Sequence, residues 1–401
     1  MSDQIVIIGA GQAGIQLADS LRREGHEGPV TLIGTEDEAP YQRPPLSKAF
    51  LLDQLDESRL PLRPDAFYEQ RDIKTRFGAT VTAIDRAHKT VTLDTSETLP
   101  YDRLALCLGA NVFIPPIPGT DLPHVLALRT LADAKQLKTA LAGAQSVAVI
   151  GGGFIGLEVA ASARKTGKTV TIIEALDRVM KRAVSEPVSR FFEALHREHG
   201  STVLLETLTE EITPGGIRLK NGDMIPADLV VMGTGVAPCQ ELAMASGLHC
   251  ENGIRVDEFA RTSDPDIVAI GDCAAHPNYL TGQTLRLESV QNAIDQAKIA
   301  ARTLTGTLEP YRAVPWFWSD QFDIKLQMAG LSGGADTTAM RGNKADRSFS
   351  IFYFRSGKLI AADSINAPAD HMAARRILAN DARTLTPAQA ADTGFDLKQA
   401  F

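Results

Sequence analysis

The sequence predicts an α/β protein with two domains of parallel strands and helices and a smaller C-terminal α+β domain. Its length of 401 residues exceeds what one ordinary hydrophobic core supports. Two glycine-rich turns each leave a short apolar strand and enter a helix, which is typical of a doubly wound sheet. From about 315 onward, short strands alternate with turns and a helix follows over 371–378, which predicts the third domain.

The first glycine turn follows an apolar strand at 5–8 and contains Gly9, Gly11, Ala13 and Gly14. In such a turn the first glycine bends the chain, the second lets the backbone approach a pyrophosphate, and the third lets the helix pack on the strand. The phosphates then lie at the helix N-terminus, where backbone N–H groups point outward. These four residues are therefore expected to contact a dinucleotide.

The second turn follows the strand at 147–150 and contains Gly151, Gly153, Ile155 and Gly156. One such turn would be weak evidence, because glycine-rich strand-to-helix turns also occur without a ligand. Two of them, each in the right context, predict two Rossmann-like dinucleotide-binding domains. The economical interpretation is a flavin and a nicotinamide between which hydride passes.

The residue after the second strand of each unit indicates which nucleotide is bound. In the second unit this strand is followed by Glu174, whose carboxylate would accept a hydrogen bond from a ribose 2′-hydroxyl and repel a 2′-phosphate. NADH is therefore expected there, with NADPH as the alternative because Arg178 and Lys181 lie nearby. In the first unit the same position is Gly34, so Glu36 is expected to reach the ribose instead.

Composition and charge argue against several classes of protein. A net charge of −8 disfavours nucleic acid as a partner. The apolar runs have the length of strands and the first strand begins near residue 5, so we expect no membrane span, no signal peptide and a cytoplasmic location. The four cysteines include no CxxC pair, which excludes a local zinc site and a redox disulfide of that kind. His196 and His199 have no third ligand in view and are predicted to lie at an exposed helix end, so no metal is expected.

The clearest linker is the proline-rich segment 114–119. Because Glu174 assigns the second domain to NADH, the first domain is left for the flavin. The predicted FAD-binding domain comprises 1–112 and 246–314, the NADH-binding domain 113–245, and the C-terminal α+β domain 315–401.

Seven segments, in order along nearly the whole chain, together carry a resemblance to a known family. They are 9–14, YQRPPLSK at 41–48, LRTL at 128–131, GGGFIGLE at 151–158, SDPDIVAIGDCA at 263–274, ESVQNA at 288–293 and WFWSDQ at 316–321. The chain resembles the FAD-dependent ferredoxin reductases of bacterial oxygenase systems. The resemblance implies the two-nucleotide plan of glutathione reductase, with FAD and NADH as cofactors.

The resemblance also implies roles for single residues. It implies an NAD contact at Gly235 and FAD contacts at Arg43, Lys48, Val81, Arg129, Asp272 and Val290. It places Lys48 and Glu158 beside the reactive ring nitrogen of the flavin, where an ammonium held by the carboxylate would stabilise the anionic reduced flavin. It places Trp318 near the flavin face and the exit route of the electrons. The alternatives are that Lys48 is an ordinary loop lysine, that Glu158 is an ordinary polar residue shortly after the glycine turn, and that Trp318 packs between domains.

The implied partner is a 2Fe-2S ferredoxin, which is usually acidic and so requires a local positive patch on this negatively charged protein. Arg63 and Lys298 match docking positions of the family, and Arg302 and Lys325 are further candidates; ordinary solvated charges are the alternative for each. Lys298 and Arg302 are four apart on one predicted helix, so they can act together. A monomer or a weak homodimer is expected.

The predicted reaction passes hydride from NADH to FAD and then single electrons to the ferredoxin, which supplies a haem monooxygenase or a Rieske dioxygenase. Hydride transfer needs no general acid or base, which agrees with the lack of an obvious acid–base pair. An NADH oxidase or disulfide reductase would place a cysteine where Pro44 and Pro45 stand. A rubredoxin reductase stays open. A signalling flavoprotein like apoptosis-inducing factor would need a basic surface or a long insertion, and neither is visible.

Overall fold

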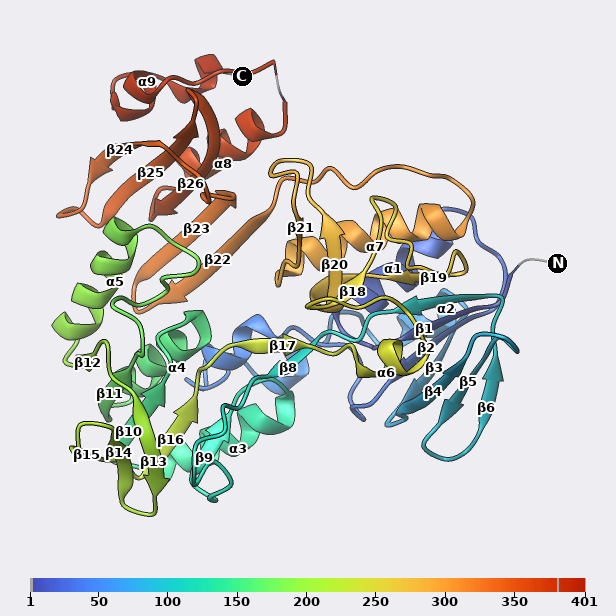
Figure 1. Ribbon diagram of the computed structural model, residues 1–401, viewed down its shortest axis with the longest axis horizontal. Helices are drawn as coiled ribbons and strands as arrows, with labels where there is room; N and C mark the ends of the chain where they lie inside the picture. The colour runs from blue at the N-terminus through green and yellow to red at the C-terminus, as the bar shows by residue number, and fades with distance from the viewer. Residues whose placement is uncertain (1–2, 381, 401) are drawn as a thin grey trace. The chain divides into compact units, whose positions relative to one another are not determined.

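The computed structural model describes residues 3–380 and 382–400, which form two compact units. The first unit contains the chain up to Gln42 together with 60–111 and 237–317. The second contains 43–59, 112–236 and 318–401. Each unit is built around its own five-stranded parallel sheet, and the second also carries an antiparallel C-terminal sheet (Figure 1).

The parallel sheet of the first unit has the strand order β19-β7-β1-β2-β3. Its strands are β1 (Ile5–Ile8), β2 (Val30–Gly34), β3 (Ile73–Phe77), β7 (Arg103–Leu106) and β19 (Ile267–Ala269). All its neighbouring strands are parallel. Helices α1 (Gln12–Arg23) and α7 (Val290–Leu304) pack on each other and on one face of the sheet.

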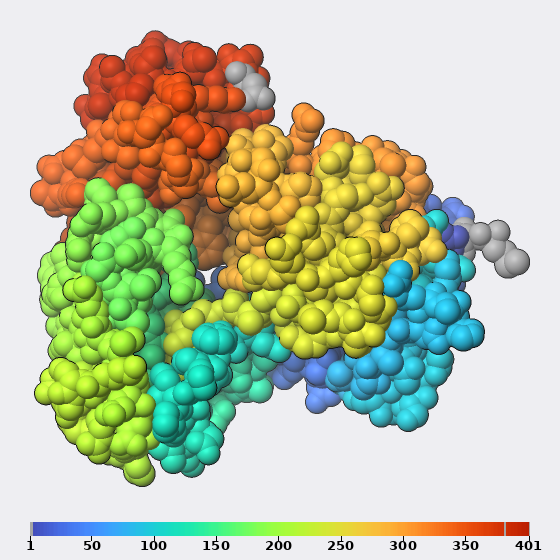
Figure 2. Space-filling model, viewed as in Figure 1, coloured from blue at the N-terminus to red at the C-terminus, as the bar shows by residue number. Residues whose placement is uncertain are grey.

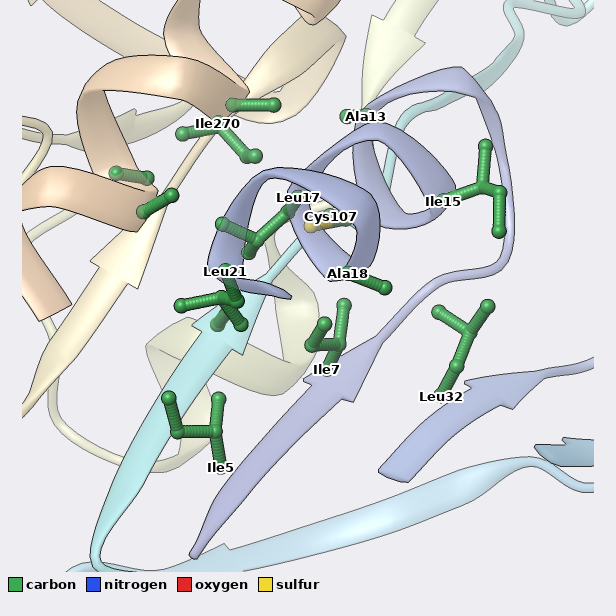
Figure 3. Close-up of a cluster of buried hydrophobic side chains, with 14 of the residues drawn as sticks. Ile5, Ile7, Ala13, Ile15, Leu17, Ala18, Leu21, Leu32, Cys107 and Ile270 are labelled. Carbon is green, nitrogen blue, oxygen red and sulfur yellow. The ribbon is translucent and has the colours of Figure 1, made fainter. Parts of the chain in front are cut away.

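Both faces of this sheet are covered, which is why its strands are apolar without interruption. Ile5 and Ile7 point into the cluster under α1, where Figure 3 shows them facing Leu17 and Leu21 of that helix. Val6 and Ile8 of the same strand enter the opposite cluster, because successive side chains of a strand alternate. That second cluster is closed by a three-stranded antiparallel sheet of β4 (Val81–Asp85), β5 (Thr90–Leu93) and β6 (Thr98–Pro100).

Short elements complete the first unit. They are α2 (Ala66–Gln70), α6 (Glu241–Ala245), β18 (Ile254–Arg255), β20 (Ala274–Pro277), β21 (Thr284–Leu285) and a 3₁₀ turn at Gly271–Cys273. The strands β8 (Ala110–Val112) and β17 (Val236–Pro238) pair with each other and contain two of the five positions at which the chain passes between the units.

The parallel sheet of the second unit has the order β12-β11-β10-β16-β9. Its strands are β9 (Val125–Ala127), β10 (Ser146–Ile150), β11 (Thr169–Ile173), β12 (Thr202–Leu204) and β16 (Leu229–Met232). Its helices are α3 (Leu131–Gly143), α4 (Phe154–Lys165) and α5 (Glu186–Glu198). A three-stranded antiparallel sheet joins β13 (Thr209–Thr213), β14 (Gly216–Leu219) and β15 (Met224–Pro226). Two 3₁₀ turns, Pro44–Ser47 and Glu57–Arg59, also belong to this unit.

The C-terminal part of the second unit is an antiparallel sheet with the order β22-β23-β26-β25-β24. Its strands are β22 (Trp316–Gln321), β23 (Ile324–Gly330), β24 (Thr337–Asn343), β25 (Ser348–Arg355) and β26 (Lys358–Ile365). Helices α8 (Pro368–Leu378) and α9 (Pro387–Ala391) and a 3₁₀ turn at Leu397–Ala400 follow. In Figure 2, α5 (green) lies against this α+β domain (orange to red), in agreement with the ring contact of Phe191 with Phe349.

Two expectations can be compared directly with this architecture. The C-terminal part of the second unit is α+β as predicted, and its helix begins three residues earlier than expected because Pro368 occupies the first helical position, where proline fits. Within the described residues, no helix is both long enough and apolar enough to cross a membrane.

Candidate functional site

The first glycine turn has the shape that a bound pyrophosphate requires. Gly9 has φ +108°, and a Cβ there would lie 2.1 Å from the Cys107 carbonyl oxygen. A Cβ on Gly14 would lie 2.0 Å from the Gly9 carbonyl oxygen, so α1 could not pack on the turn. Gly11 is different, since a Cβ there would meet nothing within 4 Å. The turn thus leaves no room for a side chain at Gly9 and Gly14, where the chain packs on itself, but leaves space at Gly11, at the helix N-terminus. This arrangement fits a dinucleotide.

The second turn repeats this arrangement in the other unit. Cβ atoms on Gly151 and Gly156 would lie 2.4 Å from the Gly233 oxygen and 2.3 Å from the Gly151 oxygen, respectively. Gly153, by contrast, would meet only the Gly233 oxygen, at 3.7 Å. Gly235 has φ +95° with open space around it, and Ile155 is 45% exposed at the start of α4. The residues present therefore fit a second dinucleotide.

Glu174 is fixed directly beside the second turn. Its Oε2 accepts a hydrogen bond from the backbone N–H of Gly152 at 2.7 Å, and its Oε1 accepts one from Leu176 at 2.8 Å. Each oxygen retains a lone pair for a ribose hydroxyl. Arg178 is turned away to backbone oxygens, at 2.8 Å from Val184, and Lys181 pairs with Asp177 at 2.9 Å. The carboxylate, rather than a basic side chain, thus occupies the end of the strand.

The predicted FAD contacts are divided between the two units. Glu36, Val81, Asp272 and Val290 lie in the first unit, and Arg43, Lys48 and Arg129 lie in the second. Glu36 is half-buried, and its Oε2 accepts a hydrogen bond from the Tyr41 hydroxyl at 2.5 Å. Asp272 lies in the 3₁₀ turn after β19, while Val81 begins β4 and Val290 begins α7.

In the second unit, two of the predicted contacts touch each other. The Arg43 guanidinium donates to the backbone oxygen of Arg129 at 2.6 Å. Lys48 directly follows the 3₁₀ turn Pro44–Ser47, whose two prolines preset its backbone. This rigid turn fixes where the Lys48 side chain starts.

Lys48 and Glu158 form an ion pair with 2.9 Å between Nζ and Oε2. The Lys48 side chain is 19% exposed, whereas that of Glu158, in the second turn of α4, is 3% exposed. The Ser47 hydroxyl donates to the same Oε2 at 2.5 Å, and the Ser319 hydroxyl donates to Oε1 at 2.7 Å. A buried charge of this kind is stable only when it is paired and hydrogen-bonded, as Glu158 is. The predicted ion pair therefore exists, and Lys48 is its less buried member.

Trp318 precedes Ser319 in β22, so its side chain points to the opposite side of the strand. Ser319 is buried, whereas Trp318 is half-buried. The hydrogen bond from Ser319 to Glu158 consequently fixes the segment of strand that carries Trp318.

The four predicted docking residues all have carboxylate neighbours. Arg63 lies 3.3 Å from Asp19, which is fully buried, and Lys298 pairs with Asp295 at 2.8 Å. Lys325 lies 3.7 Å from Asp320. Arg302 is held between Glu24 and Glu309, so two carboxylates offset its charge. Arg63, Lys298 and Arg302 belong to the first unit and Lys325 to the second.

One expectation is wrong. His196 does not lie at an exposed helix end but is fully buried, because α5 turns this face toward the C-terminal sheet, and its Nε2 lies 3.0 Å from Oε1 of Gln321. Burial lowers its pKa to about 4, so the ring is neutral. Apolar residues at 188, 192 and 195, three to four apart with 196 beside them, were the signal that this face is buried.

Sequence reasoning missed the residues that support the ion pair. Ser47, Ser319 and Gln321 lie within the family segments 41–48 and 316–321, but neither segment indicates which of its polar residues bonds Glu158. Burial raises the pKa of the Cys107 and Cys273 thiols, which makes them inert. Over residues 3–380 and 382–400, no cluster of metal-ligating side chains is found.

Comparison with known proteins places the chain. The model for the pyridine nucleotide-disulphide oxidoreductase family matches residues 3–297, and that for the reductase C-terminal domain matches 316–401. The chain belongs to this family of oxidoreductases. Within it, the chain is a member of the ferredoxin reductases that use FAD and NAD(P)H, as the resemblance implied.

Three relatives illustrate the likeness. Rhodocoxin reductase of Rhodococcus erythropolis is 50% identical over 402 residues, which cover 99% of this chain and 94% of that protein. The ferredoxin reductase of the CYP199A2 system from Rhodopseudomonas palustris has a TM-score of 0.97 and 44% identity, and 99% of each chain is covered. The reductase in the covalent putidaredoxin reductase–putidaredoxin complex has a TM-score of 0.96 and 38% identity, with 99% of this chain and 98% of that chain covered.

Proposed function

We propose that this protein transfers hydride from NADH to FAD and then passes electrons one at a time to a 2Fe-2S ferredoxin that supplies an oxygenase. The observation that carries the proposal is the pair of glycine turns. In each turn the first and last glycines leave no room for a side chain, whereas Gly11 or Gly153 between them has room around it. The two turns lie in different units, so each unit supplies one of the two proposed pyrophosphate-binding turns. FAD is assigned to Gly9–Gly14 and NADH to Gly151–Gly156.

The chain's residues have three tasks in this reaction. Glu174 selects the coenzyme, because a fixed carboxylate accepts from a ribose hydroxyl and repels a phosphate. Lys48 presents one positive charge toward the bound flavin, and Glu158 holds that ammonium in place. The FAD, when bound, accepts the hydride and releases its electrons singly. Trp318 is proposed to lie along the exit route of those electrons.

The proposed partner is acidic, and Arg63 is the best-supported docking residue. The buried carboxylate of Asp19 gathers three guanidinium groups, with Arg23 at 2.8 Å, Arg63 at 3.3 Å and Arg71 at 3.6 Å. Three positive charges around one buried negative charge leave a local excess of positive charge on a protein of net charge −8. Lys298 has a single carboxylate neighbour and is the next candidate. We further propose a cytoplasmic monomer or weak homodimer that binds no nucleic acid and no membrane.

A spectroscopic experiment tests the function. The FAD-loaded protein is reduced with NADH without oxygen and mixed in separate runs with a 2Fe-2S ferredoxin, a rubredoxin or oxygen while the flavin absorbance is recorded. Fast reoxidation by the ferredoxin is expected. Fast reoxidation by oxygen with none by any ferredoxin would refute the proposal, and preference for rubredoxin would change the partner.

Charge reversal tests the docking residues. Arg63→Glu and Lys298→Glu should slow ferredoxin reduction by roughly tenfold at low salt, because rim charges act mainly on the association rate. Arg302→Glu should have a smaller effect, since two carboxylates already offset that charge. Lys220→Glu, at an exposed position of the second unit, is the control. Equal loss of ferricyanide and ferredoxin reduction would argue against docking.

A further inference from the structure

Three buried polar residues continue inward from Glu158 of the Lys48–Glu158 pair, and together with it they form a single hydrogen-bonded chain. Ser319 donates to Glu158 at 2.7 Å, Gln321 Nε2 lies 3.3 Å from the Ser319 hydroxyl, and His196 Nε2 lies 3.0 Å from Gln321 Oε1. Counted over the whole residue, the exposed fraction is 2% for Glu158 and 0% for the other three. All four lie in the second unit, on α4, β22 and α5.

The direction of every bond in this chain follows from its charged end. An ionised carboxylate only accepts, so Ser319 must donate to Glu158. The Ser319 oxygen is then free to accept, and its neighbour must be the amide nitrogen of Gln321. The amide oxygen of Gln321 therefore faces His196, which must carry its proton on Nε2. A lowered pKa of about 4 keeps His196 neutral at ordinary pH, and the acceptor at Gln321 Oε1 selects the tautomer with its proton on Nε2.

Bonds that all point the same way reinforce one another electrostatically. Each donor in the chain directs the positive end of its dipole toward the Glu158 carboxylate. The amide of Gln321 interrupts any transfer of protons, so the chain stabilises a charge rather than moving one. With Oε1 bound to Ser319, only Oε2 is left for Lys48 and Ser47.

We propose that Ser319 is a positioning residue, which acts through Glu158 to hold the Lys48 ammonium in one place. Gln321 and His196 set the direction in which the Ser319 hydroxyl donates its hydrogen bond. The inference rests on the proposed function, because it assumes that Lys48 acts on bound FAD. Ser319 also lies next to Trp318 in β22. One hydroxyl thus fixes both the lysine that faces the flavin and the strand that carries the proposed electron exit.

The principal test compares two buried serines of the C-terminal sheet. Ser319→Ala removes the hydroxyl that donates to Glu158. Ser350→Ala removes a hydroxyl that is equally buried but bonds Ser364 at 3.0 Å and Asp370 at 2.8 Å, away from the ion pair. The readouts are the midpoint potential of the bound flavin, the rate of its anaerobic reduction by NADH, and the unfolding temperature of the FAD-free protein.

In Ser319→Ala we expect the midpoint potential to become more negative and flavin reduction to slow by roughly tenfold, because small displacements of a positioned group have large kinetic effects. The NADH concentration for half-maximal rate should stay within about twofold, since the nucleotide turn is untouched. Ser319→Thr keeps the hydroxyl and should recover most of both properties. Ser47→Ala should shift the potential in the same direction, because it removes a donor from the other carboxylate oxygen.

Two results would overturn the inference. One is a potential and a reduction rate in Ser319→Ala that equal those of the unaltered protein. The other is an equal change of both in Ser350→Ala, which would make the effect a general consequence of losing a buried serine. Failure of the proposed function can be told apart from failure of this inference. A protein that cannot reduce ferredoxin would still show a difference between the two alanine variants in the rate of flavin reduction by NADH.

Discussion

At the scale of single residues, two carboxylates of the candidate site are held in place by the backbone or by neighbouring side chains. Glu174 is held by two backbone N–H groups and Glu158 by two hydroxyls and an ammonium. Hydrogen bonds to an ionised group are about twice as strong as those between neutral groups. Each carboxylate is therefore held in one orientation, in which we propose that Glu174 binds the ribose and that Glu158 positions Lys48.

Replacing Glu174 tests coenzyme selection. Glu174→Gln removes the charge that repels a 2′-phosphate and one of the two acceptors for the turn. We expect kcat/KM for NADH to fall by roughly 10- to 100-fold and the preference over NADPH to shrink by at least as much. Steady-state kinetics with both coenzymes measure this. Glu210→Gln, at an exposed position of β13, is the control, and an unchanged preference in Glu174→Gln would contradict the assignment.

At the scale of elements, the two glycine turns position the N-termini of α1 and α4, where we propose that the nucleotides bind. Within each turn, the outer glycines leave no room for a Cβ, whereas the middle one does, and we propose that the ligand approaches there. In the C-terminal sheet, strands β25 and β26 hold another buried group, Asp363, whose Oδ2 accepts a hydrogen bond from Tyr353 at 2.6 Å. The Tyr353 hydroxyl also lies 2.6 Å from Ser185, at the N-cap of α5.

The glycine roles can be separated by two substitutions in the first turn. Gly11→Ala should change the free energy of unfolding of the FAD-free protein by no more than about 1 kcal/mol, a cost typical of a changed N-cap. It should nevertheless lower FAD affinity, because the methyl group stands where the pyrophosphate approaches. Gly14→Ala should destabilise by roughly 3 kcal/mol or prevent folding, since its Cβ would lie 2.0 Å from a backbone oxygen. Denaturant unfolding and FAD titration measure both. Equal stability loss in the two variants would refute this division of roles.

Asp363 should make stability depend on pH in a defined direction. Burial raises its pKa from 3.8 to about 7, so the folded state binds the proton more tightly than the unfolded state. Its contribution is fully present below pH 4 and is lost as pH rises toward 7. Asp363→Asn should therefore gain stability relative to the unaltered protein as pH rises from 4 to 8, by roughly 4 kcal/mol at most. Unfolding temperatures across this range test it, with exposed Asp346→Asn as the control, and a flat difference would contradict it.

At the scale of the whole molecule, three buried histidines, distributed over the two units, make stability depend on pH in the direction opposite to Asp363. Burial lowers the pKa of His196, His276 and His371 from 6.5 to about 4. The unfolded state therefore binds more protons between pH 4 and 6.5. The stability these rings contribute is present above pH 6.5 and lost as pH falls toward 4.

We accordingly expect the protein to be acid-labile. Each histidine contributes roughly 3 kcal/mol to the loss, so their combined effect outweighs the opposite contribution of Asp363. The unfolding temperature of the FAD-free protein should fall steeply between pH 6.5 and 4.5. His371→Gln should make that fall shallower, while His88→Gln, at an exposed position, should not. An unfolding temperature independent of pH over this range would refute the expectation.

Much of the fold and part of the site were predictable because they depend on local geometry. The two turns require glycine at Gly9 and Gly151, where φ is near +105°, and this requirement is visible in any strand–glycine–helix pattern. Glu174 follows its strand directly, so its place beside the turn is likewise local. The ion pair of Lys48 with Glu158 was accessible only through family resemblance, since 110 positions separate its members.

The sequence by itself determined the α/β class, the two glycine turns and the place of Glu174 beside the second turn, because each depends on backbone sterics and hydrogen bonds within one strand–turn–helix unit. Only the tertiary structure decided the partners of Glu158 and the burial of His196. Alternation along β22 shows that Ser319 and Gln321 share a face, but not what lies opposite that face. The opposing groups come from α4 and α5, far away in the chain, and only the packing of those helices on β22 brings the donors to the carboxylate.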